Sequence, residues 1–189
     1  MSQAERKKWD EKYAATRIEP AVRPPKWLLG HLEVLPHGRA LDLATGHGHS
    51  AIELARRGWI VTAIDISQVG IRIAAQAAAR VGVSIDWVVA DLDEFSLPHE
   101  RFEVITCFHY LERRRLPSEI MRSLRSGGML LFETFTLDQL RVPNNHLKNP
   151  DHLLRPAELL TLFAGLRVRA YRDVCLHDCA VASLLAEKV

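Results

Sequence analysis

The chain has 189 residues, of which 48% are hydrophobic and 25% charged, an ordinary composition for one globular domain with a sizeable core. Its formal net charge of +2 is too small to indicate a nucleic-acid-binding protein. With three cysteines a disulfide framework is not expected, and no signal peptide or apolar run of ~18 residues is found. We therefore predict a cytoplasmic protein that binds neither nucleic acid nor a membrane.

Residues 1–24 are predicted to form a helix followed by a linker in which prolines break the chain. The helix covers about residues 2–15, and Trp9 and Tyr13 lie one turn apart on one of its faces. Two interpretations stay open for this helix. It either docks its two aromatic rings on the core as a structural element or closes over bound ligands as a lid. Residues 25–189 are predicted to form the main domain.

A strand, a glycine turn and a helix follow one another near the start of that domain. Residues 39–43 are predicted to form the strand, and Gly46 and Gly48 let the backbone turn tightly and let a ligand approach closely. This arrangement commonly cradles a nucleotide-like ligand. Asp65, at the end of the next apolar run and 19 positions after Gly46, is suitably placed to hold ribose hydroxyls.

Asp42, four residues before Gly46, distinguishes between possible nucleotides. A carboxylate at this point repels a pyrophosphate and attracts a cation, by a few kcal/mol at short range. S-adenosylmethionine carries an ammonium and a sulfonium group, whereas a dinucleotide carries a pyrophosphate. A nicotinamide-dependent oxidoreductase is therefore kept only as an alternative.

Strands and helices alternate along the rest of the chain, which predicts a parallel α/β sheet with right-handed crossovers. Ligands of such sheets bind at the carboxyl ends of the strands, and Asp42, Asp65 and Asp91 all fall at or near predicted strand ends. The predicted strands cover residues 39–43, 59–64, 84–90, 101–107 and 129–133. The predicted helices between and before them cover residues 25–35, 49–57, 67–81 and 116–125, the last ended by Gly127 and Gly128.

Three stretches of the sequence resemble motifs of the class I S-adenosylmethionine-dependent methyltransferases. Leu41-Asp42-Leu43-Ala44-Thr45-Gly46-His47-Gly48 resembles motif I, and Ala90-Asp91-Leu92 resembles the adenine-binding motif. Trp9-Asp10-Glu11-Lys12-Tyr13 resembles a segment that covers the active site in many small-molecule members. The resemblance implies that cofactor contacts come from Asp42, Ala44, Gly46, Gly48, Asp65, Ile66, Asp91, Leu92 and Phe108. Trp9 and Tyr13 are then expected at the substrate or lid.

In this family the loop after the fourth strand lies beside the reactive methyl group. Here that loop begins with Phe108, His109 and Tyr110. His109 and Tyr110 are predicted to position or deprotonate the acceptor, because a histidine pKa lies near neutrality; for His109 a packing role stays open. The sequence lacks the Asn/Asp-Pro-Pro-Tyr and Pro-Cys patterns of methyltransferases that modify nucleic acids, which favours a small-molecule acceptor.

The turn-rich loop over residues 142–150 is long enough to suggest a function, and Asn145 and His146 are predicted to border the substrate. The helix opened by Arg155-Pro156-Ala157-Glu158-Leu159 resembles the corresponding region of tellurite-resistance-type and thiopurine-type methyltransferases. Two runs, over residues 166–174 and 179–188, are joined by a tight turn at His177 and Asp178. The resemblance implies that they form a terminal hairpin whose last strand is antiparallel. The donors around this turn are too closely spaced for an ordinary zinc site, so no metal is expected.

The sequence thus predicts a Rossmann-like, doubly wound α/β fold with a mostly parallel seven-stranded sheet, an antiparallel C-terminal strand and helices on both faces. The predicted function is methyl transfer from S-adenosyl-L-methionine to a small-molecule acceptor. A catalytically silent S-adenosylmethionine-binding protein is kept as a second alternative. The oligomeric state and the acceptor atom are left open.

Overall fold

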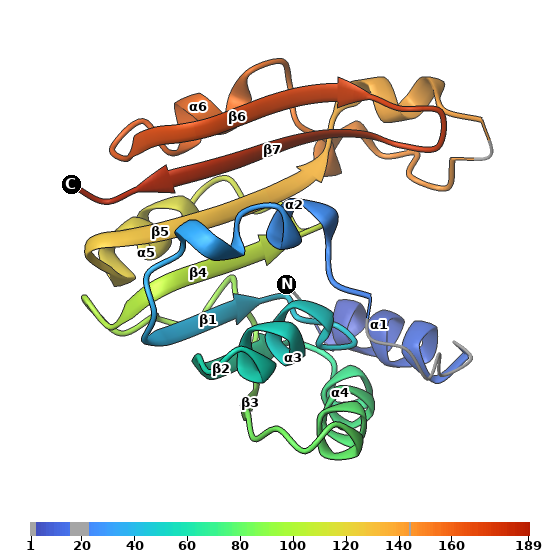
Figure 1. The fold of residues 1–189 in the computed structure, drawn as a ribbon. Coiled ribbons are helices and arrows are strands. Elements are labelled where there is room, and N and C mark those ends of the chain that lie inside the picture. Colours follow the sequence, from blue (N-terminus) through green and yellow to red (C-terminus); the bar gives the residue numbers. More distant parts are fainter. Residues whose placement is uncertain (1–2, 16–22, 144) are drawn as a thin grey trace.

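The structure, a computed structural model, describes residues 3–15, 23–143 and 145–189 (Figure 1). Seven strands form one sheet: β1 (Arg39–Leu43), β2 (Ile60–Asp65), β3 (Asp86–Val89), β4 (Phe102–Phe108), β5 (Leu124–Phe135), β6 (Arg167–Cys175) and β7 (Ala180–Glu187). The α-helices are α1 (Gln3–Ala15), α2 (Lys26–Leu29), α3 (His49–Arg56), α4 (Gln68–Arg80), α5 (Leu116–Ser123) and α6 (Glu158–Leu162). Across these ranges, no helix is long and apolar enough to cross a membrane.

The strand order is β3-β2-β1-β4-β5-β7-β6. The pairs from β3 through β5 are parallel, whereas β7 pairs antiparallel with both β5 and β6. β7 is therefore the antiparallel strand of the sheet, inserted by the terminal hairpin between β5 and β6. The predicted fold class is confirmed.

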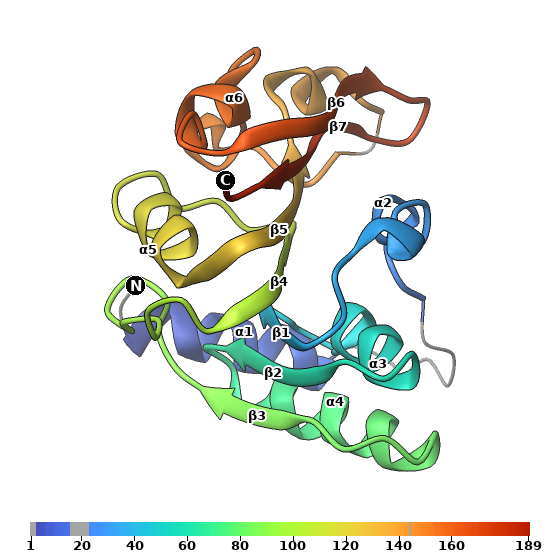
Figure 2. The same cartoon turned by 60° about the vertical axis from the view of Figure 1, so that its left-hand side comes forward.

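Apolar residues cover both faces of the sheet, and each face carries its own helices (Figure 2). One core cluster joins the sheet to α5 and α6 through Leu116, Ile120, Leu159 and Phe163. The other joins it to α2 and α3 through Trp27, Leu28, Ile52 and Leu54. Because both faces are covered, the central strands β1 and β4 are almost wholly buried, and their carboxyl ends form a rigid base for a ligand site.

Two predicted boundaries are wrong. The helix predicted for residues 25–35 is divided into the short α2 and a 3-10 turn, η1 (Leu32–Val34). The apolar side chains that this segment buries are Trp27, Leu28, Leu32 and Leu35. Gly127 and Gly128 do not end a helix. They lie inside β5, which begins at Leu124, and Gly127 has the left-handed backbone that glycine tolerates, with φ of 74°. The β4–β5 register shifts nearby.

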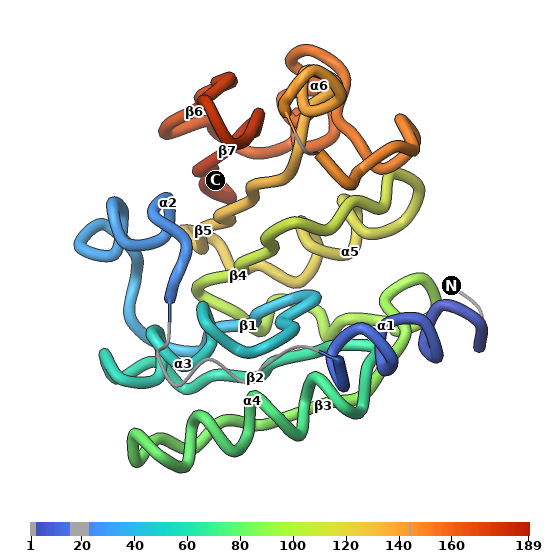
Figure 3. The backbone as a smooth tube through the Cα atoms, turned by 90° about the vertical axis from the view of Figure 1, so that its right-hand side faces the viewer, coloured from blue at the N-terminus to red at the C-terminus, as the bar shows by residue number. Residues whose placement is uncertain are grey.

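Outside the sheet, α1 packs against α4, as Figure 3 shows from the side. Two further 3-10 turns, η2 (Leu137–Arg141) and η3 (Pro150–His152), shape the long connection between β5 and α6. Arg113 fixes this connection by donating to both carboxylate oxygens of Glu158 and to the carbonyl oxygens of Asp151 and Leu153.

Candidate active site

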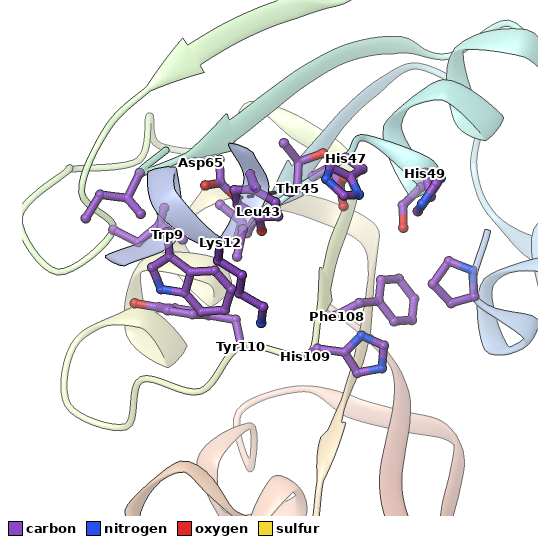
Figure 4. Close-up of a pocket in the computed structure, with 18 of the residues that line it drawn as sticks. Trp9, Lys12, Leu43, Thr45, His47, His49, Asp65, Phe108, His109 and Tyr110 are labelled. Atoms are coloured by element: carbon purple, nitrogen blue, oxygen red, sulfur yellow. Dashed lines mark hydrogen bonds between the residues drawn. The ribbon is translucent and has the colours of Figure 1, made fainter. Parts of the chain in front are cut away.

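A cavity of about 380 Å³ opens at the carboxyl ends of β1, β2 and β4, a size typical of small-molecule sites (Figure 4). Its walls come from α1, the segment before α2, the glycine loop between β1 and α3, and the residues that follow β2 and β4. Most of the site residues predicted from the sequence meet here. The predicted residues that line the cavity are Trp9, Tyr13, Asp42, Ala44, Gly46, Asp65, Ile66, Leu92, Phe108, His109 and Tyr110.

Asp42 projects from the central strand β1 at the floor of the cavity and is only 2% exposed. Its two carboxylate oxygens accept hydrogen bonds from the hydroxyls of Thr45, at 2.5 Å, and Thr106, at 2.6 Å. Thr106 lies directly opposite Asp42 in the β1–β4 register. Burial raises the pKa of Asp42 to about 6, so the group is mostly ionised at pH 7 but poorly solvated. A ligand cation would therefore be strongly attracted to it.

Asp65 ends β2 on the other side of the glycine loop and is 5% exposed. One carboxylate oxygen accepts from the backbone N–H of Gly46 at 2.8 Å and the other from that of Ser67 at 2.9 Å. Burial raises the pKa of Asp65, and the two amide donors oppose that rise. Each oxygen of a carboxylate can accept a second hydrogen bond, so Asp65 is fixed in orientation and still able to receive two hydroxyl donors.

His109 and Tyr110 follow β4 at the opposite wall. His109 has a left-handed backbone with φ of 59°, unusual for a side chain of this size, and its ring stacks on Phe135 with centroids 4.9 Å apart. The enclosed surroundings lower the pKa of His109, so its ring is neutral at pH 7. Burial raises the pKa of Tyr110, whose hydroxyl donates to Asp93 at 3.0 Å. Only His109 of this pair is suited to accept a proton.

His47 was not singled out from the sequence beyond its place in the motif. Its Nε2 atom is buried and has no hydrogen-bond partner within the described residues. Its ring lies 4.9 Å from the ring of Tyr13. Burial lowers the pKa of His47, the nearby Asp65 carboxylate raises it by less, and the Lys12 ammonium lowers it further. An orphaned polar atom in a cavity wall indicates a group that a ligand would satisfy.

Tyr13 of α1 lies over two glycines. A Cβ at Gly46 would lie 2.8 Å from the Tyr13 hydroxyl, and one at Gly70 would lie 3.0 Å from the edge of the Tyr13 ring. Trp9 stacks on Tyr13 with centroids 5.7 Å apart, and the ammonium of Lys12 lies 4.3 Å from the Trp9 ring centroid. The expectation that Trp9 and Tyr13 share a face agrees with this geometry, and the missing Cβ of Gly46 makes room for α1.

Two predicted cofactor residues lie outside the cavity wall that the described residues form. A Cβ at Gly48 would lie 2.9 Å from both the Ala74 methyl group and the Trp87 ring, so glycine is needed there for packing. Asp91 follows β3 next to Leu92, and its carboxylate accepts from the backbone N–H of Asp93 at 3.0 Å.

The loop residues Asn145 and His146 are not brought to the cavity either. The Asn145 amide is buried and bonds to Gln139 and to both backbone groups of Leu147. His146 is exposed. This geometry makes Asn145 a structural residue of the loop, and His146 does not line the cavity. The sequence pattern showed a long polar loop but not the direction in which it folds.

Residues 40–128 match the protein family described as Methyltransferase domain, a span that begins in β1 and ends in β5 and contains the glycine loop, Asp65 and His109. This part of the chain is therefore similar to known methyltransferase domains. The resemblance of its motifs to that class is thereby confirmed.

Several known proteins are similar to this chain, some in sequence and others in fold. A ubiquinone biosynthesis O-methyltransferase from Histophilus somni is 33% identical over 109 residues, covering 53% of this chain and 46% of that protein. An S-adenosylmethionine-dependent methyltransferase from Methanosarcina mazei has a TM-score of 0.70 at 21% identity, over 85% of this chain and 97% of that one. TehB from Haemophilus influenzae also has a TM-score of 0.70, at 20% identity, and the match covers 98% of this chain and 67% of the TehB chain. The chain spans about half the length of the curated relatives it matches.

Proposed function

We propose that the chain transfers a methyl group from S-adenosylmethionine to a small-molecule acceptor. The observation that carries this proposal is the pair of buried carboxylates, Asp42 and Asp65, that flank the glycine loop in one cavity. A nucleoside with a cationic side arm complements both groups, whereas the pyrophosphate of a dinucleotide would be repelled by Asp42. The methyltransferase-domain match over residues 40–128 supports the same function.

The cavity residues fit this cofactor from end to end. Asp65, with two remaining acceptor positions, suits the two ribose hydroxyls, and the apolar Ile66 and Leu92 beside it suit the adenine ring. Asp42 suits the cationic part. The orphaned Nε2 of His47 and the ammonium of Lys12, which also lines the cavity, suit the carboxylate of the amino-acid end. An adenine contact from Asp91 stays a prediction of the family motif.

When bound, S-adenosylmethionine supplies an electrophilic methyl group on a positively charged sulfur. The chain's own residues then have three tasks. The walls formed by Trp9, Pro25 and Phe108 exclude water and hold the acceptor against the cofactor site. The neutral ring of His109 accepts a proton from an acceptor hydroxyl, and Tyr110, which stays protonated, orients the acceptor. An oxygen acceptor agrees with the O-methyltransferase named among the relatives.

We further propose that residues 1–24 serve as a lid to the domain formed by residues 25–189. Trp9, Lys12 and Tyr13 of α1 line the cavity without belonging to either core cluster. A lid of this kind would desolvate the acceptor after both ligands have entered.

The test is calorimetric titration of the whole chain with S-adenosylmethionine, S-adenosylhomocysteine and NAD, followed by an assay of S-adenosylhomocysteine release with hydroxyl, thiol and amine acceptors. We expect binding of the first two ligands and turnover with a hydroxyl acceptor. Binding of NAD alone would overturn the proposal in favour of an oxidoreductase. Tight binding of S-adenosylmethionine without turnover on any acceptor would indicate a catalytically silent binding protein.

A further inference from the structure

The lid helix α1 is not held in place by a hydrophobic face. None of its described residues is buried, and its 13 residues are mostly charged or polar. An isolated helix of this length is marginally stable in water, and a helix without an apolar stripe gains little from packing. The position of α1 over the cavity therefore depends on a few specific contacts.

The clearest of these contacts is made by Asp10. One of its carboxylate oxygens accepts from the hydroxyl of Ser67 at 2.5 Å and from the backbone N–H of Val69 at 3.1 Å. Val69 lies in the first turn of α4, where backbone N–H groups have no partner inside the helix and a negative charge is favoured. Asp10 thus supplies from α1 part of the N-terminal cap of α4.

Ser67 connects this cap to the ligand site. Its hydroxyl also accepts from the backbone N–H of Gly70 at 3.0 Å, and its own N–H donates to Asp65. Ser67 is fully buried, so these bonds are shielded from competing water. One residue therefore holds the lid helix with its hydroxyl and orients the ribose-binding carboxylate with its backbone.

Tyr13, one turn after Asp10, lies against the same part of α4. Its ring occupies the space left by the missing Cβ atoms of Gly46 and Gly70. With Asp10 bonded and Tyr13 seated, Trp9 and Lys12 line the cavity (Figure 4). Asp10 itself is not part of the wall that the described residues form.

We propose that Asp10 is a positioning residue that fastens the lid to the first turn of α4 and, through Ser67, couples lid closure to the orientation of Asp65. The inference rests on the proposed function, since it assigns Asp10 a role in holding the cofactor. Ligand that binds Asp65 then favours the closed lid, and an unfastened lid weakens ligand binding even though Asp10 makes no contact with the ligand.

The experiment uses the full chain with Asp10→Ala and Asp10→Asn, and with Glu11→Ala as the matched control. Glu11 is the neighbouring carboxylate on α1, and its side chain is 68% exposed. Hydrogen exchange of the α1 amides is measured with and without S-adenosylhomocysteine, whose affinity is measured by calorimetry. For Asp10→Ala we expect lost α1 protection and about tenfold weaker binding, since two charge-assisted bonds are removed. Asp10→Asn keeps an acceptor oxygen, so its α1 protection and its affinity should lie between those of Asp10→Ala and the wild type. Glu11→Ala should match the wild type in both measurements.

Ser67→Ala and the double variant Asp10→Ala/Ser67→Ala complete a double-mutant cycle with Asp10→Ala. The two changes are expected to be non-additive in S-adenosylhomocysteine affinity, because both break the same bond. Unchanged α1 exchange in Asp10→Ala, or a lower melting temperature with unchanged affinity, would overturn the inference and leave Asp10 as a structural cap. If the wild type does not bind S-adenosylhomocysteine, the proposed function fails, while the exchange of α1 without ligand still tests the fastening contact.

Discussion

Replacing Asp42 with Asn should make the protein more stable and the cofactor bind more weakly. The rise in the Asp42 pKa from 3.8 to about 6 means that keeping this carboxylate ionised at pH 7 costs the folded state roughly 3 kcal/mol. Asparagine removes that cost and keeps one acceptor oxygen. The amide NH2 group cannot accept, so one of the two bonds from Thr45 and Thr106 is lost, at a cost of about 1–2 kcal/mol. The net gain of roughly 1–2 kcal/mol corresponds to a melting temperature a few degrees higher.

The pH dependence of the melting temperature separately tests whether ionised Asp42 destabilises the folded state. Because the folded-state pKa is raised, the destabilisation from ionised Asp42 is present above about pH 6 and disappears as the pH falls toward 3.8. The advantage of Asp42→Asn in thermal melts should therefore be largest at pH 7 and shrink toward pH 4. Asp86→Asn, which changes an exposed aspartate on β3, serves as the matched control.

Calorimetric titration with S-adenosylmethionine tests the second part of the prediction, that Asp42→Asn binds the cofactor more weakly than the wild type. The loss of an opposite charge a few ångströms from the ligand cation should weaken binding at least about tenfold at an intermediate dielectric. A variant that melts below the wild type at pH 7 and binds the cofactor equally well would refute the reasoning, because Asp42 would then be an ordinary structural residue.

Three more changes test separate parts of the site. His47→Phe should weaken S-adenosylhomocysteine about tenfold but leave 5′-methylthioadenosine, which lacks the amino-acid end, unaffected; an equal loss for both ligands in calorimetry would contradict the carboxylate contact. His109→Ala should lower kcat by about 10²–10⁴ and abolish a wild-type rate profile that rises with pH through a pKa below 6.5, whereas an unchanged profile would exclude His109 as the base. Gly70→Ala places a methyl group 3.0 Å from the Tyr13 ring, so cofactor binding should weaken while the melting temperature stays level or rises, and unaltered binding would argue against a seated lid.

Local sequence patterns were sufficient to predict the sheet and the floor of the cavity. The glycine loop, Asp42 and Asp65 lie close together along the chain or at the ends of apolar runs, and the carboxyl ends of parallel strands meet at one edge. The family resemblance, and not a local pattern, predicted that His109 and Tyr110 lie beside them. In the structure they line the same cavity because they follow β4, which pairs with β1. The positions of the glycine loop, Asp42 and Asp65 follow from which segments form strands and from the parallel pairing of those strands.

What the sequence could not supply are contacts between distant segments. The bond between Thr106 and Asp42 depends on the register of two strands that are 64 residues apart along the chain. Gly48 looked like a ligand glycine, yet it is required for packing against Trp87, which no local pattern shows. Asn145 looked like a site residue because its loop is long and polar, and only the folded loop reveals its bond to Gln139.

Asp10 illustrates the same limit at the lid. Asp10 belongs to the segment that resembles a family motif, but the sequence gives no sign of what its carboxylate binds. Its partners Ser67 and Val69 lie 57 and 59 positions further along the chain. Helix propensity therefore predicts α1, but only its docking on α4 shows what holds it.

The most direct measurement of the central claim is calorimetric titration of S-adenosylmethionine into the wild type and Asp65→Ala. The account predicts saturable binding to the wild type. Because it assigns Asp65 the two ribose hydroxyls, it also predicts an affinity lower by about tenfold to a hundredfold in the variant. Absence of binding to the wild type, or equal affinity for both proteins, would contradict it.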